Sequence, residues 1–365
     1  MIRDLTDPRA AAIVRRHKSY WNNEPWTGPL LQFHPIAVRP DITTTLPAHL
    51  YKPPPPLDGA QFCAEIERAY DQHGLLTDHL IHMVGTGITS EVLVGCPVVV
   101  QAGTHWAEAC FVDWYQLDDY RVQDAIWYQR LIENTQRSVE AAGSEKYPFC
   151  CMVFRGAVDM AEAMMTGKGL CEAVADHPRE LKDLLARITD IIIETALAHS
   201  AVLPFYQGGQ FNSFGIWTPG RTVLFTVDAG CLFSPICYEE FFLPYDLRLC
   251  EAFDTPLIHL HAASRQHFSA WTEIPNLGLQ CVIDQAWLPS GVNKPIGPQL
   301  PELLPAFKVI RARKSLMLDG FWDENLIDMT IAELPPGGCA IRGAVEDPVA
   351  IRQRYLRHNC KSVSD

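Results

Sequence analysis

Four apolar runs of strand length in the last third of the chain constrain the fold more than any other feature. They are TPLIHLHA at 255–262, LQCVIDQ at 279–285, SLMLDGF at 315–321 and CAIRGA at 339–344. Each segment between them, SRQHFSAWTEI, QLPELLPAFKVIRA and DENLIDMTIAEL, is long enough for a crossover helix. Regular alternation of strand and helix predicts a parallel sheet, and runs without polar alternation are typical of strands covered on both faces.

Two α/β architectures, an open doubly wound sheet and a closed barrel, are compatible with this alternation. The dinucleotide-binding pattern GxGxxG follows none of the strands, and polar residues suited to catalysis end several different strands. Both observations favour the barrel. Because no Gly/Ser-rich linker divides the elements after about residue 88, we predict a single (β/α)8 TIM barrel with an N-terminal extension. Residues 1–80 are expected to form an N-terminal arm and the start of the barrel, and residues 81–360 the barrel itself.

Two helix starts carry clear local signals. Asp176 stands before Pro178 and a series of apolar residues at helical spacing over 181–195, so we expect a helix that Asp176 caps. The second signal is Ser234 followed by Pro235, a hydroxyl cap with proline in the first helical position.

The charge balance excludes several classes of partner. The formal net charge is −13, and no concentrated run of Lys or Arg is present, so neither a nucleic acid nor an anionic membrane is expected to bind. No window approaches the ~18 uninterrupted apolar residues of a membrane helix, and no signal-peptide core is found. The 12 cysteines form no CxxC pair and suit reduced, buried thiols. We expect a soluble cytoplasmic protein, either a monomer or a homodimer.

The strand that ends in His259-Leu260-His261 supplies the strongest candidate for a functional site. Residues at i and i+2 of a strand point to the same side, so both imidazoles can reach one ligand. In a parallel barrel, functional side chains gather where the strands end, because the loops there meet at one mouth. The alternative is that one histidine is a hydrogen-bonded core residue and the other a loop residue. Further candidates on the neighbouring strands are Asp284, Asp319, Cys339 and Arg342.

His259, His261 and Cys339 form a candidate metal-binding set of two nitrogens and one sulfur, with a fourth position open. Such a set suits Zn²⁺ acting as a Lewis acid. Ligands from separate strands leave no short sequence pattern. Cys339 also follows Gly337-Gly338, where a cysteine can simply begin a strand.

Residues earlier in the chain are candidates for substrate binding. The segment FYQGGQFNSFG at 205–215 is a Gly-bearing loop with polar groups suited to orienting a ligand. The predicted substrate-binding residues are Tyr206, Gln207, Asn212, Trp217 and Asp319. The predicted catalytic residues are His259, His261, Asp228 and Asp284. Signatures of P-loops, serine hydrolases, helical zincins and EF-hands are absent, which disfavours those chemistries.

Taken together, these segments resemble the uroporphyrinogen decarboxylase superfamily, a barrel group that includes corrinoid-linked and zinc-dependent methyltransferases. The resemblance covers about residues 148 to 358. It rests on FRGAVDMAE at 154–162, Asp228, Ser234-Pro235, Tyr238 and FFLPY at 241–245. His259-Leu260-His261 matches the position of a His-x-Cys in the methyltransferase branch, and GCAI at 338–341 matches the second cysteine of that branch.

The resemblance implies a closed barrel that binds its substrate at the carboxyl-terminal mouth. In the methyltransferase branch, one His and two Cys hold Zn²⁺, which binds the acceptor thiol as a thiolate for attack on a methyl group delivered by a corrinoid protein. The implied ligands here are His259, His261 and Cys339, with His261 in place of the first cysteine. Imidazole makes the site more positive, which leaves two alternatives open: an acceptor other than a thiol, or a site without metal.

The decarboxylase branch uses an N-terminal arginine segment to bind substrate carboxylates, and this chain has LQFHP at 31–35 instead. A highly anionic porphyrinogen is therefore a poor candidate for a chain of net charge −13. We predict a methyltransferase or demethylase that works with a corrinoid protein and transfers a methyl group to or from a small molecule with metal assistance. One alternative is a metal-free decarboxylase or lyase with one of the two histidines as general acid. Another is a non-catalytic subunit that binds a corrinoid or a small ligand.

Overall fold

A seven-stranded parallel sheet forms the centre of the protein. The computed structural model describes residues 5–24, 29–35, 48–72, 89–101, 104–111, 113–114, 122, 125–143, 146–287, 293–335 and 337–359. The strand order is β1-β14-β13-β10-β9-β8-β5, and each neighbouring pair is parallel. The strands are β1 (Leu30–Pro35), β5 (Val153–Arg155), β8 (Thr222–Thr226), β9 (Thr255–His261), β10 (Gly278–Val282), β13 (Leu316–Phe321) and β14 (Cys339–Val345). The predicted parallel sheet is confirmed.

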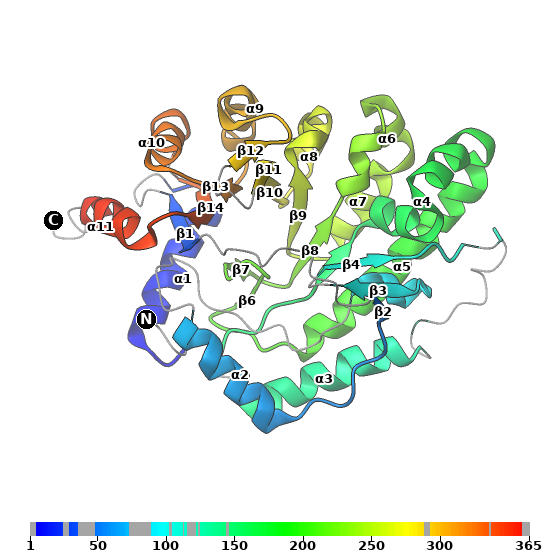
Figure 1. Cartoon of the computed structure of the whole chain (residues 1–365), viewed down its shortest axis with the longest axis horizontal. Coiled ribbons are helices and arrows are strands. Elements are labelled where there is room, and N and C mark those ends of the chain that lie inside the picture. Colours follow the sequence, from blue (N-terminus) through cyan, green and yellow to red (C-terminus); the bar gives the residue numbers. More distant parts are fainter. Residues whose placement is uncertain are drawn as a thin grey trace.

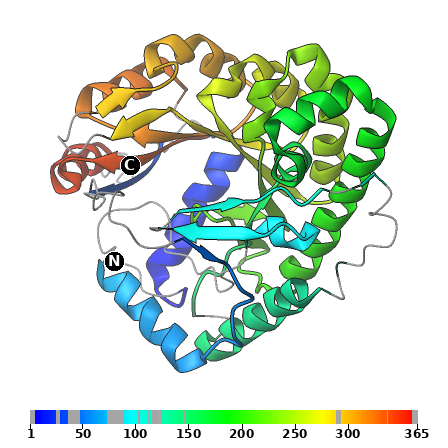
Figure 2. The ribbon, with the colours of Figure 1, turned by 45° about the vertical axis from the view of Figure 1, so that its right-hand side comes forward.

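The helices that follow the strands from β5 onward form an arc outside the curved sheet (Figures 1 and 2). They are α4 (Ala157–Asp176), α5 (Pro178–Val202), α6 (Pro235–Phe241), α7 (Leu243–Glu251), α8 (Phe268–Glu273), α9 (Leu300–Arg311), α10 (Glu324–Glu333) and α11 (Pro348–Asn359). Side chains alternate along each strand, so that Ile258 and Leu260 of β9 join the core formed with the helices. His259 and His261 consequently face the inner side of the sheet.

The closed eight-stranded barrel is not confirmed by the described residues. β1 and β5 are the two edges of the sheet, and in the described part of the chain no strand joins them. The short helix η2 (Ser90–Val94) lies beside β5, where Ser90 Oγ accepts a hydrogen bond of 2.9 Å from the Arg155 amide. The predicted boundary between residues 80 and 81 lies outside the described residues.

The N-terminal helix α1 (Pro8–Trp21) and a hairpin of β6 (Gly209–Phe211) and β7 (Trp217–Pro219) cover the amino-terminal ends of the strands. The indole of Trp21 donates a hydrogen bond of 2.7 Å to the Trp217 carbonyl, and the Ser315 hydroxyl, next to the start of β13, donates to the Tyr20 carbonyl. A Cβ at Gly278, the first residue of β10, would lie 2.7 Å from the Trp21 ring. One end of the sheet is therefore closed by packing.

The remaining elements are smaller. β2 (His49–Leu50), β3 (Val98–Gln101) and β4 (Thr104–Ala107) form an antiparallel sheet, and β11 (Gln285–Trp287) pairs with β12 (Asn293–Pro295). α2 (Gly59–Gln72) packs on α3 (Ile126–Ala142). None of the helices in the described part of the chain has the length and hydrophobicity needed to span a membrane.

One predicted helix start is confirmed and one is corrected in part. Ser234 caps α6, because its Oγ accepts a hydrogen bond of 3.3 Å from the Cys237 amide, and Pro235 is the first helical residue. α5 begins at Pro178 as expected, but Asp176 does not cap it. Asp176 is the last residue of α4, and His177 alone separates the two helices, with φ −133 and ψ 49 and no side-chain cap.

Candidate functional site

β9 holds His259 and His261 side by side at its carboxyl end. The ring centroids are 5.1 Å apart and the rings are nearly perpendicular. Both side chains are partly buried, with 21% of His259 and 35% of His261 exposed. The spacing of two residues therefore places both imidazoles on one side of the strand, as the sequence indicates.

Asp228 approaches the same point from the neighbouring strand. It is the first residue of the short helix η4 (Asp228–Leu232), which follows β8. Its Oδ1 lies 3.8 Å from Nε2 of His259 and 3.7 Å from Nε2 of His261. The three potential ligand atoms all lie within 4.8 Å of one another. These separations are too long for strong hydrogen bonds and suit three ligands that share one ion.

The other nitrogen of each imidazole is held by a hydrogen-bond acceptor. Nδ1 of His261 lies 2.5 Å from Oδ1 of Asp284, and Nδ1 of His259 lies 2.5 Å from Oε1 of Gln280. Because these oxygens accept, each Nδ1 carries a proton, and a neutral ring then has its lone pair on Nε2. Histidine ligands of metals typically have such partners, which fix the tautomer and the ring orientation.

A network of polar side chains extends from Nδ1 of His259 across the four strands β10, β13, β14 and β1. Nε2 of Gln280 donates to Oδ2 of Asp319 at 3.5 Å, and Arg342 forms an ion pair with the same carboxylate. The Arg342 Nε donates to Oε1 of Gln32 at 2.9 Å. Since a carboxylate accepts the Gln280 amide, the oxygen of that amide must face His259. Asp319, predicted to bind substrate, is part of this network.

Asp159, in the first turn of α4, anchors the segment that carries Asp228. Its Oδ1 accepts the Ala229 amide at 2.8 Å, and its Oδ2 accepts the Thr226 hydroxyl. Asp159 is fully buried. Burial is the main cause that raises its pKa, and the negative charge of Asp228 raises it further. The side chain of Asp228 is 48% exposed, and its partial desolvation raises its pKa, while His261 and Arg155 act to lower it.

The two histidines differ in their electrostatics. The pKa of His259 is lowered to about 4, mainly by burial and to a smaller extent by the charge of the neighbouring His261. The hydrogen bond to Asp284 raises the pKa of His261, against the effect of burial. His259 is therefore neutral near pH 7, with a lone pair on the nitrogen that faces Asp228.

Cys339 does not lie in this cluster, which corrects the predicted ligand set. It is the buried first residue of β14 and pairs with Leu316, the first residue of β13. Burial raises the pKa of its thiol to about 12, and the charge of Arg311, the last residue of α9, acts against that rise. The cysteine begins its strand at the end covered by α1, whereas the histidines end theirs. Asp228 takes its place as the third candidate ligand.

Four predicted substrate-binding residues also lie at the end covered by α1. They are Tyr206, Gln207, Asn212 and Trp217. The Tyr206 hydroxyl donates to the Leu5 carbonyl, and the Trp217 amide donates to Nδ1 of His17 in α1. Oδ1 of Asn212 accepts two amides of its own loop. The hairpin precedes β8, so its polar groups organise the closed end of the sheet and not the histidine site.

Sequence reasoning missed Gln280, although its position carries a signal. Gln280 is a completely buried amide within an otherwise apolar stretch, LQCVI. Buried polar side chains need partners, so a single amide in such a run indicates a hydrogen-bond network inside the sheet. Asp159 belongs to the segment 154–162 that carries the resemblance, which predicts no role for it.

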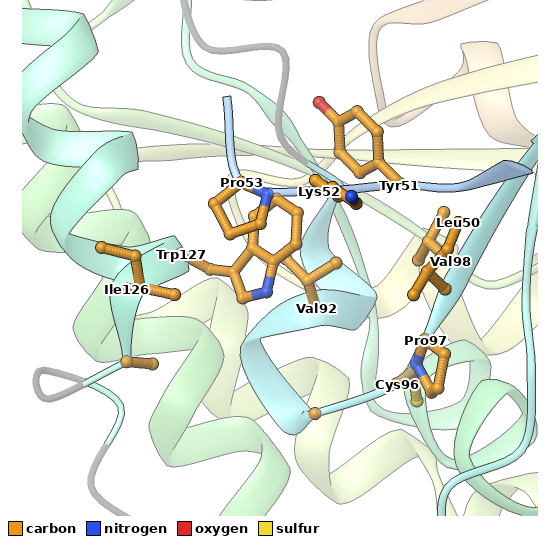
Figure 3. Close-up of a pocket in the computed structure, with 12 residues that line it drawn as sticks. Leu50, Tyr51, Lys52, Pro53, Val92, Cys96, Pro97, Val98, Ile126 and Trp127 are labelled. Atoms are coloured by element: carbon orange, nitrogen blue, oxygen red, sulfur yellow. The ribbon is translucent and has the colours of Figure 1, made fainter. Parts of the chain in front are cut away.

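A separate pocket of about 460 Å³ lies among β2, η2, β3 and the start of α3 (Figure 3). Its walls are mainly apolar and include Tyr51 stacked on Trp127 at 5.3 Å between ring centroids. None of the residues of the histidine site lines it.

Comparison with known proteins identifies the fold only. No family model matches the chain, and no curated protein matches it. The solved structure of a methyltransferase from Methanosarcina mazei is similar, with a TM-score of 0.61 and 15% identity, over 94% of this chain and 99% of that chain. The likeness supports an α/β, barrel-like fold over nearly the whole chain.

Proposed function

We propose that the chain is a metal-dependent methyltransferase of the uroporphyrinogen decarboxylase superfamily. It would transfer a methyl group between a small molecule and a corrinoid carried by a partner protein. The observation that carries the proposal is the convergence of His259 Nε2, His261 Nε2 and Asp228 Oδ1, all within 4.8 Å of one another. The likeness to a methyltransferase structure supports methyl transfer as the reaction.

The donor set of the site fits a divalent metal. Two imidazole nitrogens and one carboxylate oxygen are ligands that Zn²⁺ accepts, and three protein ligands leave a position for a substrate. The residues that would hold the metal are His259, His261 and Asp228. The bound metal would supply Lewis acidity that lowers the pKa of a substrate nucleophile.

The chain's own groups prepare this site. Asp284 and Gln280 orient the two rings through their Nδ1 protons. Asp159 fixes the turn after β8 through the Ala229 amide and so sets the position of Asp228. Two imidazoles and one carboxylate form a ligand set that Zn²⁺ uses in catalytic sites, so we propose Zn²⁺ as the metal. Because none of the ligands is a thiolate, oxygen, nitrogen and sulfur nucleophiles are all compared as acceptors.

The test uses purified full-length protein with free methylcobalamin as the methyl donor. Metal content is measured by elemental analysis, and demethylation of the corrinoid is followed by its visible absorbance with thiol, amine and alcohol acceptors. We expect one Zn²⁺ per chain and acceptor-dependent demethylation that a chelator abolishes and Zn²⁺ restores. His259→Ala should lose both metal and activity, whereas Cys339→Ser, at the other end of the sheet, should keep both.

Other outcomes separate the alternatives. If the metal-free protein still turned over a carboxylated substrate, a metal-free decarboxylase or lyase would be favoured. Binding of a corrinoid without any turnover, unchanged in His259→Ala, would favour the non-catalytic subunit. A metal that is lost in Cys339→Ser and retained in Asp228→Asn would overturn the ligand set.

A further inference from the structure

Two cysteines on either side of the β3–β4 hairpin lie against each other. The Sγ atoms of Cys96 and Cys110 are 3.1 Å apart, although both residues are free thiols. Cys96 follows η2, and Cys110 follows β4. Neither residue belongs to the histidine site, and the proposed function does not use them.

We propose that Cys96 and Cys110 form a redox site that a peroxide converts reversibly into a disulfide. The two sulfurs need to approach by only about 1 Å to reach the disulfide bond length of about 2.05 Å. Hydrogen bonds anchor both backbones. The Cys96 amide donates to the Glu91 carbonyl at 3.2 Å, and the Cys110 amide donates to the Met164 carbonyl at 2.9 Å.

The two thiols differ in access, which assigns their roles. Cys96 is buried, with 3% of its surface exposed, whereas Cys110 is partly exposed. A hydrogen bond with the Cys96 thiol lowers the pKa of Cys110, while the same contact and burial raise the pKa of Cys96. Cys110 is therefore the thiolate that meets the oxidant, and Cys96 is the resolving thiol.

The reaction balances with hydrogen peroxide as the only co-reactant. The Cys110 thiolate attacks one peroxide oxygen, the O–O bond breaks, and with one proton the products are a Cys110 sulfenic acid and water. The Cys96 thiol then attacks the sulfenic sulfur, the S–O bond breaks, and a second water leaves as the disulfide forms. Sulfur loses two electrons and peroxide gains them. A dithiol reagent reverses the change.

The disulfide would join two segments that contact different parts of the molecule. η2 carries Glu91, whose carboxylate accepts a hydrogen bond of 2.7 Å from Arg155 Nε at the end of β5. Cys110 and the following Phe111 are anchored on α4 through the Met164 carbonyl. Cys96 also lines the apolar pocket, beside Pro97 in Figure 3. Oxidation would thus fix one wall of that pocket.

The experiment treats the intact protein with a small excess of hydrogen peroxide, alkylates the remaining thiols and maps the peptides by mass spectrometry. Trypsin leaves both cysteines in one fragment, because no Lys or Arg lies between Arg68 and Arg121. Cleavage after Glu91 and Glu108 separates them. We expect a linked pair of peptides, lighter by two hydrogens than the sum of the two, which a dithiol reagent separates.

Matched variants complete the test. In Cys96→Ser, Cys110 should stop at the sulfenic acid and react with a dione trap, and no linked peptide should form. Cys150→Ser, which alters a buried cysteine next to Cys151, should leave the link intact. Full alkylation of Cys96 and Cys110 after peroxide, or linkage of either one to a different cysteine, would overturn the proposal. Neither result depends on methyl transfer, so the proposed function is tested separately.

Discussion

The Asp284 carboxylate accepts a hydrogen bond from Nδ1 of His261, the ring nitrogen that faces away from Asp228, with 2.5 Å between Oδ1 and Nδ1. Asp284 follows β10 and His261 ends β9, so a contact between neighbouring strands fixes the orientation of the ring. The ring then presents Nε2 to Asp228 at 3.7 Å. The carboxylate makes the imidazole a stronger ligand, because it stabilises the positive charge that the ring gains on binding a cation.

Replacement of Asp284 by alanine should weaken Zn²⁺ binding by about 10- to 100-fold, the usual effect of losing a partner behind a histidine ligand. Asp284→Asn keeps an acceptor oxygen and loses the charge, so a smaller loss is expected. Competition with a chromogenic chelator measures both affinities. Asp176→Asn, an exposed carboxylate at the end of α4, is the control. If Asp284→Ala bound Zn²⁺ as tightly as the control, the role of this contact would be refuted.

Gln280→Leu should lower both the stability of the fold and the metal affinity. The change leaves the Nδ1 proton of His259 without its acceptor, and an unsatisfied buried group costs about 1–3 kcal/mol. Urea unfolding of the metal-free protein measures the stability term alone. Gln61→Leu on the exposed face of α2 should change the free energy of unfolding by less than about 0.5 kcal/mol. Equal midpoints for the two variants would argue against the network behind His259.

The sequence predicts the C-terminal half of the fold well, because its strands are long, apolar and regularly separated by helices. β9, β10, β13 and β14 all lie within the four predicted runs or extend them by one residue. The small antiparallel sheet is different. β2 has two residues, and its pairing with β3 joins segments about 50 positions apart, so local pattern carries almost no information about it.

The site was predictable only where strand periodicity governs it. The spacing of His259 and His261 fixes their common side, and the position of Asp284 just after the next strand predicts its proximity. The predicted ligand Cys339 is wrong because a polar residue on a late strand reaches the mouth only when it lies at the carboxyl end of that strand. A residue that begins a parallel strand lies at the opposite end, as the pairing of Cys339 with Leu316 shows. The sequence predicts Asp228 as a site residue. Its distance from the two histidines depends on the path of the loop after β8, which no local pattern predicts.

Asp246 should give the stability a pH dependence of defined sign. It is buried in α7 and accepts hydrogen bonds from the Tyr238 hydroxyl at 2.6 Å and the Trp271 indole at 3.3 Å. Burial raises the pKa of Asp246 to about 7, although both hydrogen bonds act to lower it. The folded chain therefore holds the proton more tightly than the unfolded chain, whose carboxyl has a pKa of about 3.9.

The contribution of Asp246 to stability consequently falls as the pH rises from about 4 to about 7, and it is constant above that range. Asp246→Asn removes this change. The variant should therefore gain stability relative to the unmodified protein as the pH rises from 5 to 8, which urea titrations show as an increase in its relative free energy of unfolding. Asp176→Asn should show a constant difference over the same range. Parallel curves for Asp246→Asn would mean that the carboxyl titrates at its ordinary pKa.

Gly343→Ala should destabilise the sheet next to the Arg342 network. Gly343 lies in β14 opposite Gly320 of β13, has a φ of +139°, and a Cβ there would lie 1.9 Å from the Gly320 carbonyl oxygen. Both the backbone conformation and the contact oppose a side chain, so we expect a loss of about 3 kcal/mol or more.

Gly208→Ala separates the two causes of this loss. Gly208 has a φ of +82°, but a Cβ there would meet no atom within 4 Å. This variant carries only the cost of placing an alanine at a positive φ, about 1–2 kcal/mol. Urea unfolding compares the two. A Gly343→Ala variant that loses no more stability than Gly208→Ala would show that β13 can move away from β14. In that case the ion pair of Arg342 with Asp319, which bridges the same two strands, would not depend on their close approach at Gly343.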